Sequence, residues 1–281
     1  PTGKDYAVGY TRDLYERISE VPFISINGAA PAGSGLTSVQ DMARYVIMQM
    51  QGGVTQDGAR VVSAASLAET HRPGIAVPPD GLNALPAILL PDTASMFYAL
   101  GWFEQTFTDG RHLLWHAGGI DGFGSLMGFF PADQIGFVLL TNQEPSRGGA
   151  LFNFSVQASL LDRLYGLNAT LPALLASFVP ILDQQSADLA ARTRPVDPTE
   201  MAPWLGLYEQ GFSVRLDDAG ALHLDHDIRS MPLVGMDDGS YLVTDGPGAI
   251  FGHGVTFSTD AEDDRVMSIA GFDPVRWLTG A

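Results

Sequence analysis

Four apolar, strand-like segments between residues 97 and 141 most constrain what this chain can fold into. They are short, rich in β-branched and aromatic residues, and separated by turn residues. Pro131, Ala132 and Asp133 are typical of a tight turn between the last two. The pattern predicts an antiparallel meander made of residues 97–103, 113–115 running into His116, 125–130 and 135–141.

Helix signals flank this predicted sheet. Thr37 or Ser38 is a suitable N-cap for a helix over 38–51, with Asp41 in its first turn and glycines after its end. A shorter helix is expected to begin at Ser63 and to end before Pro73. Residues 149–165 carry an apolar stripe suited to lying across a sheet. An α/β (α+β) class follows, with an antiparallel sheet flanked by helices.

Three parts of the chain differ in texture. Residues 1–166 mix helical and strand signals, and 167–195 are predicted to form a helical connector. Residues 196–281 contain short alternating strands between acidic turns, a rhythm that predicts a small all-β barrel. The strands expected there are residues 213–216, 221–224, 241–243, 254–257 and 266–269.

A long loop interrupts the first part. Residues 73–94 contain five prolines and several leucines, with little helix or strand pattern. Long irregular segments inside compact domains are usually functional or disordered. If this loop overhangs a cleft, its apolar residues over 75–90 favour a hydrophobic substrate substituent.

Composition excludes some classes of partner. The formal net charge is −17, from 32 acidic against 15 basic residues, and there is no basic stripe. Such a chain repels nucleic acid and anionic membrane surfaces. Cysteine is absent, which excludes disulfides and thiolate metal sites.

Neither the first ten residues nor the longest uncharged run predicts membrane insertion. The first ten residues lack a basic start and an apolar core, so no targeting signal is recognised there. Residues 164–182 form a run of 19 without a charge, but Gly166, Pro172 and Pro180 interrupt it. The compact apolar part is too short to span a bilayer.

His116 stands at the head of a glycine-rich segment. By itself it could be a strand-end histidine held by local hydrogen bonds. Three stretches in fixed order add to it: PAGSGLTSVQDMARYV (31–46), YALGWF (98–103) and WHAGGIDGFGSLMGFFPADQIGFVLLTN (115–142). Together they resemble the C-terminal half of a serine β-lactamase-like domain. The resemblance is closest to class C β-lactamases, D-aminopeptidases and esterases related to penicillin-binding proteins.

The resemblance implies roles for four residues. The family's third active-site element is Lys-Thr-Gly, or His-x-Gly in many esterases and peptidases, and here it matches His116-Ala117-Gly118. His116 is then expected to line the cleft, with Ala117 and Gly118 in contact with substrate. Gly118 would let the acyl group approach the strand, and the Gly119 N–H would be half of an oxyanion hole.

Two family motifs are missing from the sequence. The family uses Ser-x-x-Lys for nucleophile and base, and usually Tyr-x-Asn. Lys4 is the only lysine, so no Ser-x-x-Lys exists in these 281 residues. Family order places both motifs upstream of Pro1, which is then a processing or sequence boundary. The expected partner is the protein's own N-terminal half, and the fragment alone is expected to be inactive.

Other catalytic motifs fail on their residues. No serine lies in Gly-x-Ser-x-Gly, Gly122-Phe123-Gly124 lacks the third glycine of a dinucleotide loop, and no strand begins at Pro1 to place a secondary-amine base. Over residues 223–227 at most two side chains share a strand face, so a solvated strand is favoured over a metal site. Asp121 and Asn142 are interpreted as turn caps. No metal or cofactor is predicted.

The function expected from the resemblance is a serine hydrolase that forms an acyl-enzyme with an ester, amide or lactam. His116 in place of lysine favours esterase or peptidase activity over a true β-lactamase. The Trp204–Glu209 stretch, WLGLYE, resembles the head of a lipocalin-like barrel appended to such enzymes. Relatives are often periplasmic, which leaves an extracytoplasmic location open.

Two other interpretations stay open. One is a non-catalytic binding protein that keeps the hydrolase fold, with the C-terminal barrel as its ligand or partner site. The other is a stable half of the catalytic protein whose partner is its own N-terminal half, because a sheet and helix left uncovered would expose core surface.

Overall fold

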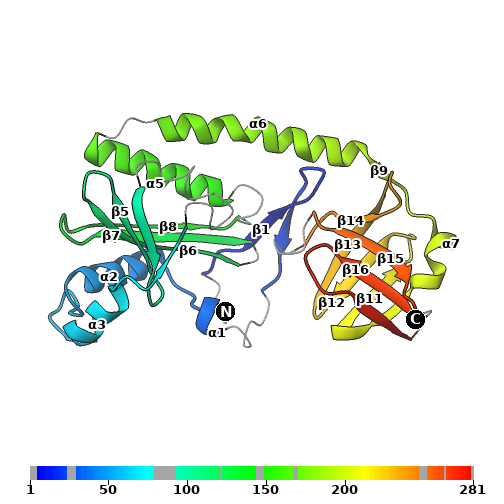
Figure 1. The fold of residues 1–281 in the computed structure, drawn as a ribbon, viewed down its shortest axis with the longest axis horizontal. Coiled ribbons are helices and arrows are strands. Elements are labelled where there is room, and N and C mark those ends of the chain that lie inside the picture. Colours follow the sequence, from blue (N-terminus) through cyan, green and yellow to red (C-terminus); the bar gives the residue numbers. More distant parts are fainter. Residues whose placement is uncertain are drawn as a thin grey trace. The chain divides into compact units, whose positions relative to one another are not determined.

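A computed structural model describes residues 5–23, 30–78, 93–120, 122–143, 149–166, 170–246, 252–262 and 264–279 (Figure 1). The chain divides into two compact units. One comprises Ser25–Val179, and the other combines Pro1–Ile24 with Pro180–Ala281.

The first unit is built on a six-stranded antiparallel sheet in which sequence neighbours are also spatial neighbours. The antiparallel meander expected from the sequence is therefore confirmed, except for its first strand. The strands are β3 (Ile75–Ala76), β4 (Thr93–Tyr98), β5 (Phe103–Phe107), β6 (His112–Ile120), β7 (Phe123–Phe130) and β8 (Ile135–Thr141).

Residues 97–103 are not one strand, as expected, but the end of β4, a turn and the start of β5. The Ala99 N–H donates to the Trp102 carbonyl oxygen at 2.7 Å, and Gly101 adopts a φ of 83°. Ala99 and Trp102 are nonetheless buried in the core. An apolar turn looks like a strand in sequence because burial, rather than backbone conformation, sets its hydrophobicity.

Helices α2 (Val39–Met50) and α3 (Ala64–His71) begin where the caps predicted. The Ser38 side chain accepts from the Asp41 N–H, and the Ser63 side chain accepts from the Ser66 N–H. α2 packs on β7 and β8, where a β-carbon on Gly136 would come within 2.6 Å of Val46. Glycine at that position therefore permits close packing between helix and sheet.

The opposite face of the sheet is covered by α5 (Gly149–Tyr165), as its apolar stripe predicted; Figure 1 shows α5 on one side of the strands and α2 on the other. Phe154 on α5 meets the Trp115 ring edge-on, with centroids 5.8 Å apart. The cluster beneath α5 includes Leu113, Trp115, Leu126, Phe130 and Leu161.

Two further helices complete the connections. α1 (Ala30–Gly33) is a single turn close to β6. α6 (Thr170–Ala191) is a helix within the range 167–195, for which helical structure was expected, and it contains Pro180. No helix in the described parts of the chain is long and apolar enough to cross a membrane.

The second unit contains an eight-stranded closed barrel. The strands follow one another in an antiparallel ring that the β12–β13 pairing closes, and β9 (Thr193–Arg194) adds to one end of β13. The barrel strands are β10 (Gly206–Tyr208), β11 (Phe212–Leu216), β12 (Leu222–His226), β13 (Arg229–Met236), β14 (Tyr241–Val243), β15 (Gly254–Thr259), β16 (Arg265–Ile269) and β17 (Val275–Thr279).

Three barrel strands were not predicted, namely β10, β13 and β17. β13 is the longest strand of the barrel, yet it holds Pro232 and Gly235. Both residues weaken a strand signal in sequence. In the fold, Pro232 still finds a place in the ladder opposite His223, so the surrounding strands decide the conformation.

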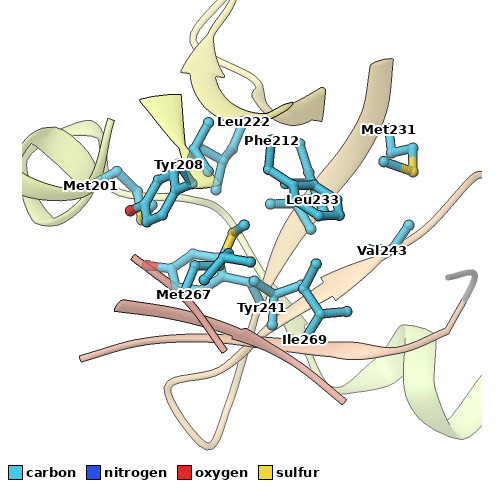
Figure 2. Packing of buried hydrophobic residues seen from close by; sticks show 14 residues of the cluster. Met201, Tyr208, Phe212, Leu222, Met231, Leu233, Tyr241, Val243, Met267 and Ile269 are labelled. Carbon is cyan, nitrogen blue, oxygen red and sulfur yellow. The ribbon is translucent and has the colours of Figure 1, made fainter. Parts of the chain in front are cut away.

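Apolar side chains fill the barrel interior, and Figure 2 shows them directed from opposite walls toward one another. Alternation produces this core: Leu222 and Leu224 of β12 are buried while His223 between them is only partly buried. α7 (Pro198–Met201) contributes Met201, which is fully buried. The Tyr208 hydroxyl donates to the Trp204 carbonyl oxygen at 2.8 Å, satisfying the one polar atom of that ring.

The hairpin of β1 (Gly9–Arg12) and β2 (Ile18–Val21) belongs to the barrel's unit, although the sequence grouped it with residues 1–166. Leu14 in its turn is buried with Met236 and Leu242, and the Leu14 N–H donates to the Thr244 carbonyl oxygen at 2.9 Å. A contact between residues so distant in sequence leaves no local pattern.

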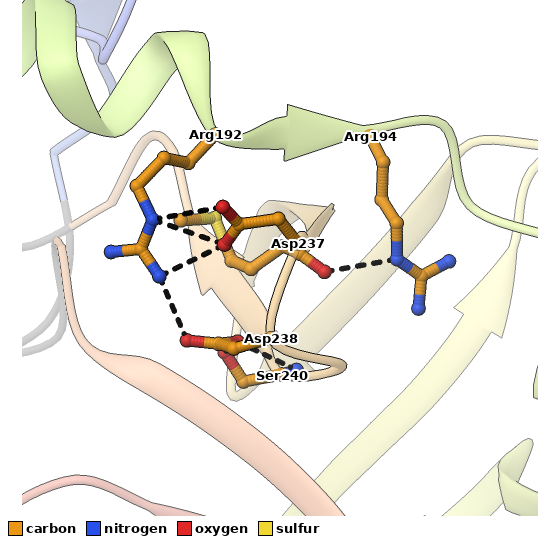
Figure 3. A network of polar contacts seen from close by, with 6 residues as sticks. Arg192, Arg194, Asp237, Asp238 and Ser240 are labelled. Atoms are coloured by element: carbon orange, nitrogen blue, oxygen red, sulfur yellow. Dashed lines mark hydrogen bonds and ion pairs between the residues drawn. The ribbon is translucent and has the colours of Figure 1, made fainter.

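An ion-pair network attaches the end of α6 to the barrel (Figure 3). The Arg192 guanidinium contacts Asp237 at 2.9 Å and Asp238 at 3.0 Å, and Arg194 donates to the Met236 carbonyl oxygen at 2.9 Å. These groups are largely exposed, so water screens their charges and the ion pairs contribute little to stability. The network therefore orients the strand β9 more than it stabilises the unit.

Candidate active site

The residues of β6 become less buried from Trp115 onward, and the predicted site lies in this less buried part. Leu113, Leu114 and Trp115 are buried, His116 is half-buried, and Gly118 and Gly119 are exposed. The pairing explains this change. β5 begins at Phe103, which is opposite Trp115 on β6. The residues before Phe103 form the turn from β4, so β5 does not continue beside the rest of β6. Beyond Trp115, no described strand pairs with that side of β6.

His116 is held at this open end by aromatic neighbours. Its Nε2 lies 3.1 Å from the Tyr98 hydroxyl, a hydrogen bond whose direction depends on the imidazole tautomer. The Phe103 ring stacks on the His116 imidazole, with ring centroids 5.7 Å apart. Tyr98 was missed as a site residue, although it opens the YALGWF stretch. Its contact with His116 depends on the β4–β5 turn, which the sequence did not reveal.

Strand alternation distributes the four predicted residues over two faces. His116 and Gly118 lie on the face that α2 covers further along, whereas Ala117 and Gly119 lie on the face beneath α5. Ala117 packs against the apolar cluster of that second face. The structure thus brings His116 and Gly118 together, and it places the Ala117 side chain on the opposite side of the strand.

The two glycines have different partners on β7. Gly118 is opposite Ser125, and a β-carbon on Gly118 would lie 2.5 Å from the Ser125 Oγ. Gly119 is opposite Gly124, so neither residue of that pair carries a side chain. No side chain of this pair therefore covers the backbone where the resemblance places the oxyanion hole.

A buried polar relay lies behind Gly119 and was not foreseen. The Asn153 amide on α5 donates to the Thr141 Oγ1 at 3.4 Å, and the Thr141 hydroxyl donates to the Gly124 carbonyl oxygen at 3.3 Å. Asn153 is 3% exposed. Through Gly124, the relay connects α5 to the strand pair that holds Gly119. A polar residue on the buried face of α5 was the only available sequence signal.

Some sequence predictions fall on residues other than the described ones. Asp121, Lys4, Pro1 and most of the proline-rich loop, residues 79–92, lie outside the described residues. Asn142 directly follows Thr141 at the end of β8.

The polar residues of β12 have partners within the barrel. His223 lies 3.2 Å from the Asp217 Oδ2 and 3.0 Å from the Ser230 Oγ. Arg215 donates to Asp225 at 2.6 Å, and the His226 Nε2 lies 3.2 Å from the Gln210 carbonyl oxygen. Their polar atoms serve strand-to-strand contacts.

The fold and this strand edge agree with the β-lactamase-like domain that the sequence resembles. A model of the Beta-lactamase family matches residues 3–161, more than half of the sequence. The chain therefore belongs to the Beta-lactamase family.

Two curated fungal relatives match parts of this region. The unguisins hydrolase ungD of Aspergillus violaceofuscus (strain CBS 115571) is 29% identical over 150 residues, which is 50% of this chain and 25% of that protein. The unguisins hydrolase ungD' of Aspergillus campestris (strain IBT 28561) is 25% identical over 170 residues, 58% of this chain and 27% of that protein. The matched segments thus span about a quarter of these relatives.

The solved structures that the chain matches include the octameric penicillin-binding protein homologue from Pyrococcus abyssi. It has a TM-score of 0.44 and 19% identity, over 98% of this chain and 54% of that one. The crystal structure of SurE has a TM-score of 0.36 and 16% identity, over 99% of this chain and 57% of that one.

Proposed function

We propose that this protein is a serine hydrolase that forms an acyl-enzyme and acts on an ester or a peptide-like amide. The observation that carries the proposal is the open end of β6, where half-buried His116 is followed by two exposed glycines. Family membership over residues 3–161 supports hydrolysis as the reaction class. The relatives' names, which describe hydrolases of unguisins, support the same class.

The chemistry follows from that strand edge. A serine Oγ attacks the substrate carbonyl carbon and forms a tetrahedral adduct, whose negative oxygen accepts hydrogen bonds from backbone N–H groups that include Gly119. The adduct collapses, the alcohol or amine leaves with a proton, and an ester joins substrate to serine. Water then attacks this ester and releases the acid.

His116 favours neutral substrates in this proposal. An ammonium group would attract a substrate carboxylate as a point charge, whereas a neutral imidazole offers only a hydrogen bond. The strands β6, β7 and β8 contain no lysine or arginine that could supply the charge instead. Esters and amides are therefore proposed in preference to lactams that carry a carboxylate.

The nucleophile is proposed to come from the protein's own N-terminal half. Ser-x-x-Lys is absent from this sequence, and its only lysine is Lys4. The proposed partner segment would carry Ser-x-x-Lys and Tyr-x-Asn and would face the His116 side of the sheet. Residues 1–281 would then be inactive by themselves.

A covalent probe tests the function directly. Full-length protein is treated with a fluorescent fluorophosphonate, digested, and mapped by mass spectrometry, while hydrolysis of p-nitrophenyl butyrate is followed in parallel. We expect a label on the serine of a Ser-x-x-Lys motif and measurable turnover. Absence of both label and turnover would overturn the proposal.

A matched pair of variants tests the role of the strand edge. We expect His116→Ala to reduce kcat/KM about 100-fold, a loss in the range of one lost transition-state contact. His112→Ala is the control, because His112 begins the same strand and contacts Glu104 at 2.8 Å. Equal losses in the two variants would remove His116 from the site.

A further inference from the structure

Ser125 shares the open sheet face with His116. It is directly opposite Gly118 in the β6–β7 ladder, and Met127 is opposite His116. Directly paired residues of antiparallel strands project to the same side, so Ser125 and His116 are diagonal neighbours. At that spacing both side chains can contact one bound molecule.

The Ser125 hydroxyl lies in the space that Gly118 leaves. A β-carbon on residue 118 would come within 2.5 Å of the Ser125 Oγ, closer than such atoms can approach. Glycine at 118 therefore allows this serine conformation, in addition to any room it leaves for substrate. The position of the Ser125 hydroxyl therefore depends on the absence of a side chain at residue 118.

This hydroxyl is also available. Within the described residues the Ser125 Oγ makes no hydrogen bond, and its side chain is only half-buried. Leu140, opposite Ser125 on β8, is 39% exposed. The cluster with Val46 of α2 instead covers Leu114 and Phe129 at the other end of these strands. Ser125 thus lies outside the part of the face that this cluster covers.

We propose that Ser125 is a substrate-contacting residue whose hydroxyl donates a hydrogen bond to a second, neutral carbonyl oxygen of the acyl group. This inference rests on the proposed function and narrows it to acyl groups with an amide or ester carbonyl near the scissile bond. Serine can donate to such an oxygen, and its neutral hydroxyl gives a carboxylate no opposite charge.

Two substrates separate this contact from hydrolysis in general. In full-length protein, Ser125→Ala is compared with the unmodified enzyme on p-nitrophenyl N-acetylalaninate, which has the extra amide carbonyl, and on p-nitrophenyl butyrate, which lacks it. We expect kcat/KM to fall about 3- to 10-fold on the first ester, the value of one neutral hydrogen bond. It should change less than about 2-fold on the second. Ser95→Ala, in β4 of the same sheet, is the control.

A double-mutant cycle tests the pairing with Gly118. Gly118→Ala should push the Ser125 hydroxyl aside, so Ser125→Ala should lower kcat/KM on the amide ester in the parent and have almost no further effect in the Gly118→Ala background. If Ser125→Ala lowers kcat/KM on that ester by the same factor in both backgrounds, the pairing is overturned.

The outcomes distinguish the two proposals. Equal effects of Ser125→Ala on both esters, or none, would overturn the contact and leave the hydrolase proposal standing. An unmodified enzyme that hydrolyses neither ester and takes no covalent label would overturn both.

Discussion

The barrel and the open end of the sheet use similar residues in opposite ways. His223 on the barrel wall lies between Asp217 and Ser230, and Asp225 pairs with Arg215, so these polar atoms serve the fold. On the sheet, His116 has one polar partner among the described residues, Tyr98, and it lies next to exposed glycines. A histidine indicates function only when its surroundings leave part of it for a ligand.

The largest effect is expected in the barrel, on the free energy of unfolding. Leu224→Ala removes a fully buried side chain from the barrel core and should reduce the free energy of unfolding by about 2–5 kcal/mol. Leu207→Ala, at a position 50% exposed on β10, is the control and should cost much less. Chemical denaturation measures both. A loss below about 1 kcal/mol for Leu224→Ala would mean that the core can collapse around the cavity.

The next effect concerns the relay behind Gly119. Asn153→Ala should reduce stability by about 1–3 kcal/mol, because a buried hydrogen bond is lost and the Thr141 hydroxyl loses a neighbour. For the proposed hydrolase activity of the full-length protein, kcat should fall with little change in KM if the relay positions the Gly119 backbone. The control is Phe152→Ala on the exposed side of α5. An unchanged kcat would limit Asn153 to a structural role.

A smaller effect is expected on the sheet, where Tyr98 contacts His116. Tyr98→Phe removes the hydroxyl that contacts the His116 Nε2 and keeps the ring packed on Phe103. We expect a roughly 3- to 10-fold loss in kcat/KM, because the imidazole loses the hydrogen bond that fixes its orientation. Stability should be almost unchanged. A kcat/KM equal to that of the parent would remove Tyr98 from the positioning of His116.

The smallest effect is a charge effect in the barrel's unit. Burial, and secondarily Asp13, raise the pKa of Asp245 above its ordinary value. A raised carboxyl pKa means that the folded state binds the proton more tightly, so stability falls as pH rises through the folded pKa. Asp245→Asn should therefore stabilise the protein at neutral pH, and the gain should vanish below the ordinary pKa of aspartate. Thermal unfolding between about pH 3 and pH 8 measures this, and a gain independent of pH would contradict it.

Local patterns were sufficient for much of the fold. Ser38 was identified as a possible helix cap, and Ser63 as the start of a helix, because capping involves residues only three positions apart. The meander over β6 to β8 was visible because short turns join its strands. The glycine-rich segment after His116 was also a local signal, and it was part of the resemblance to the β-lactamase-like family.

The sequence by itself determined the caps, the alternation of the barrel strands and the position of His116 before two glycines, since these depend on neighbours along the chain. Only the tertiary structure decided that Tyr98 meets His116, that Ser125 lies in the space left by Gly118, and that Leu14 is buried with Met236 and Leu242. These contacts join residues from different elements. Their geometry depends on strand register, turns and long-range burial, which no short stretch of sequence encodes.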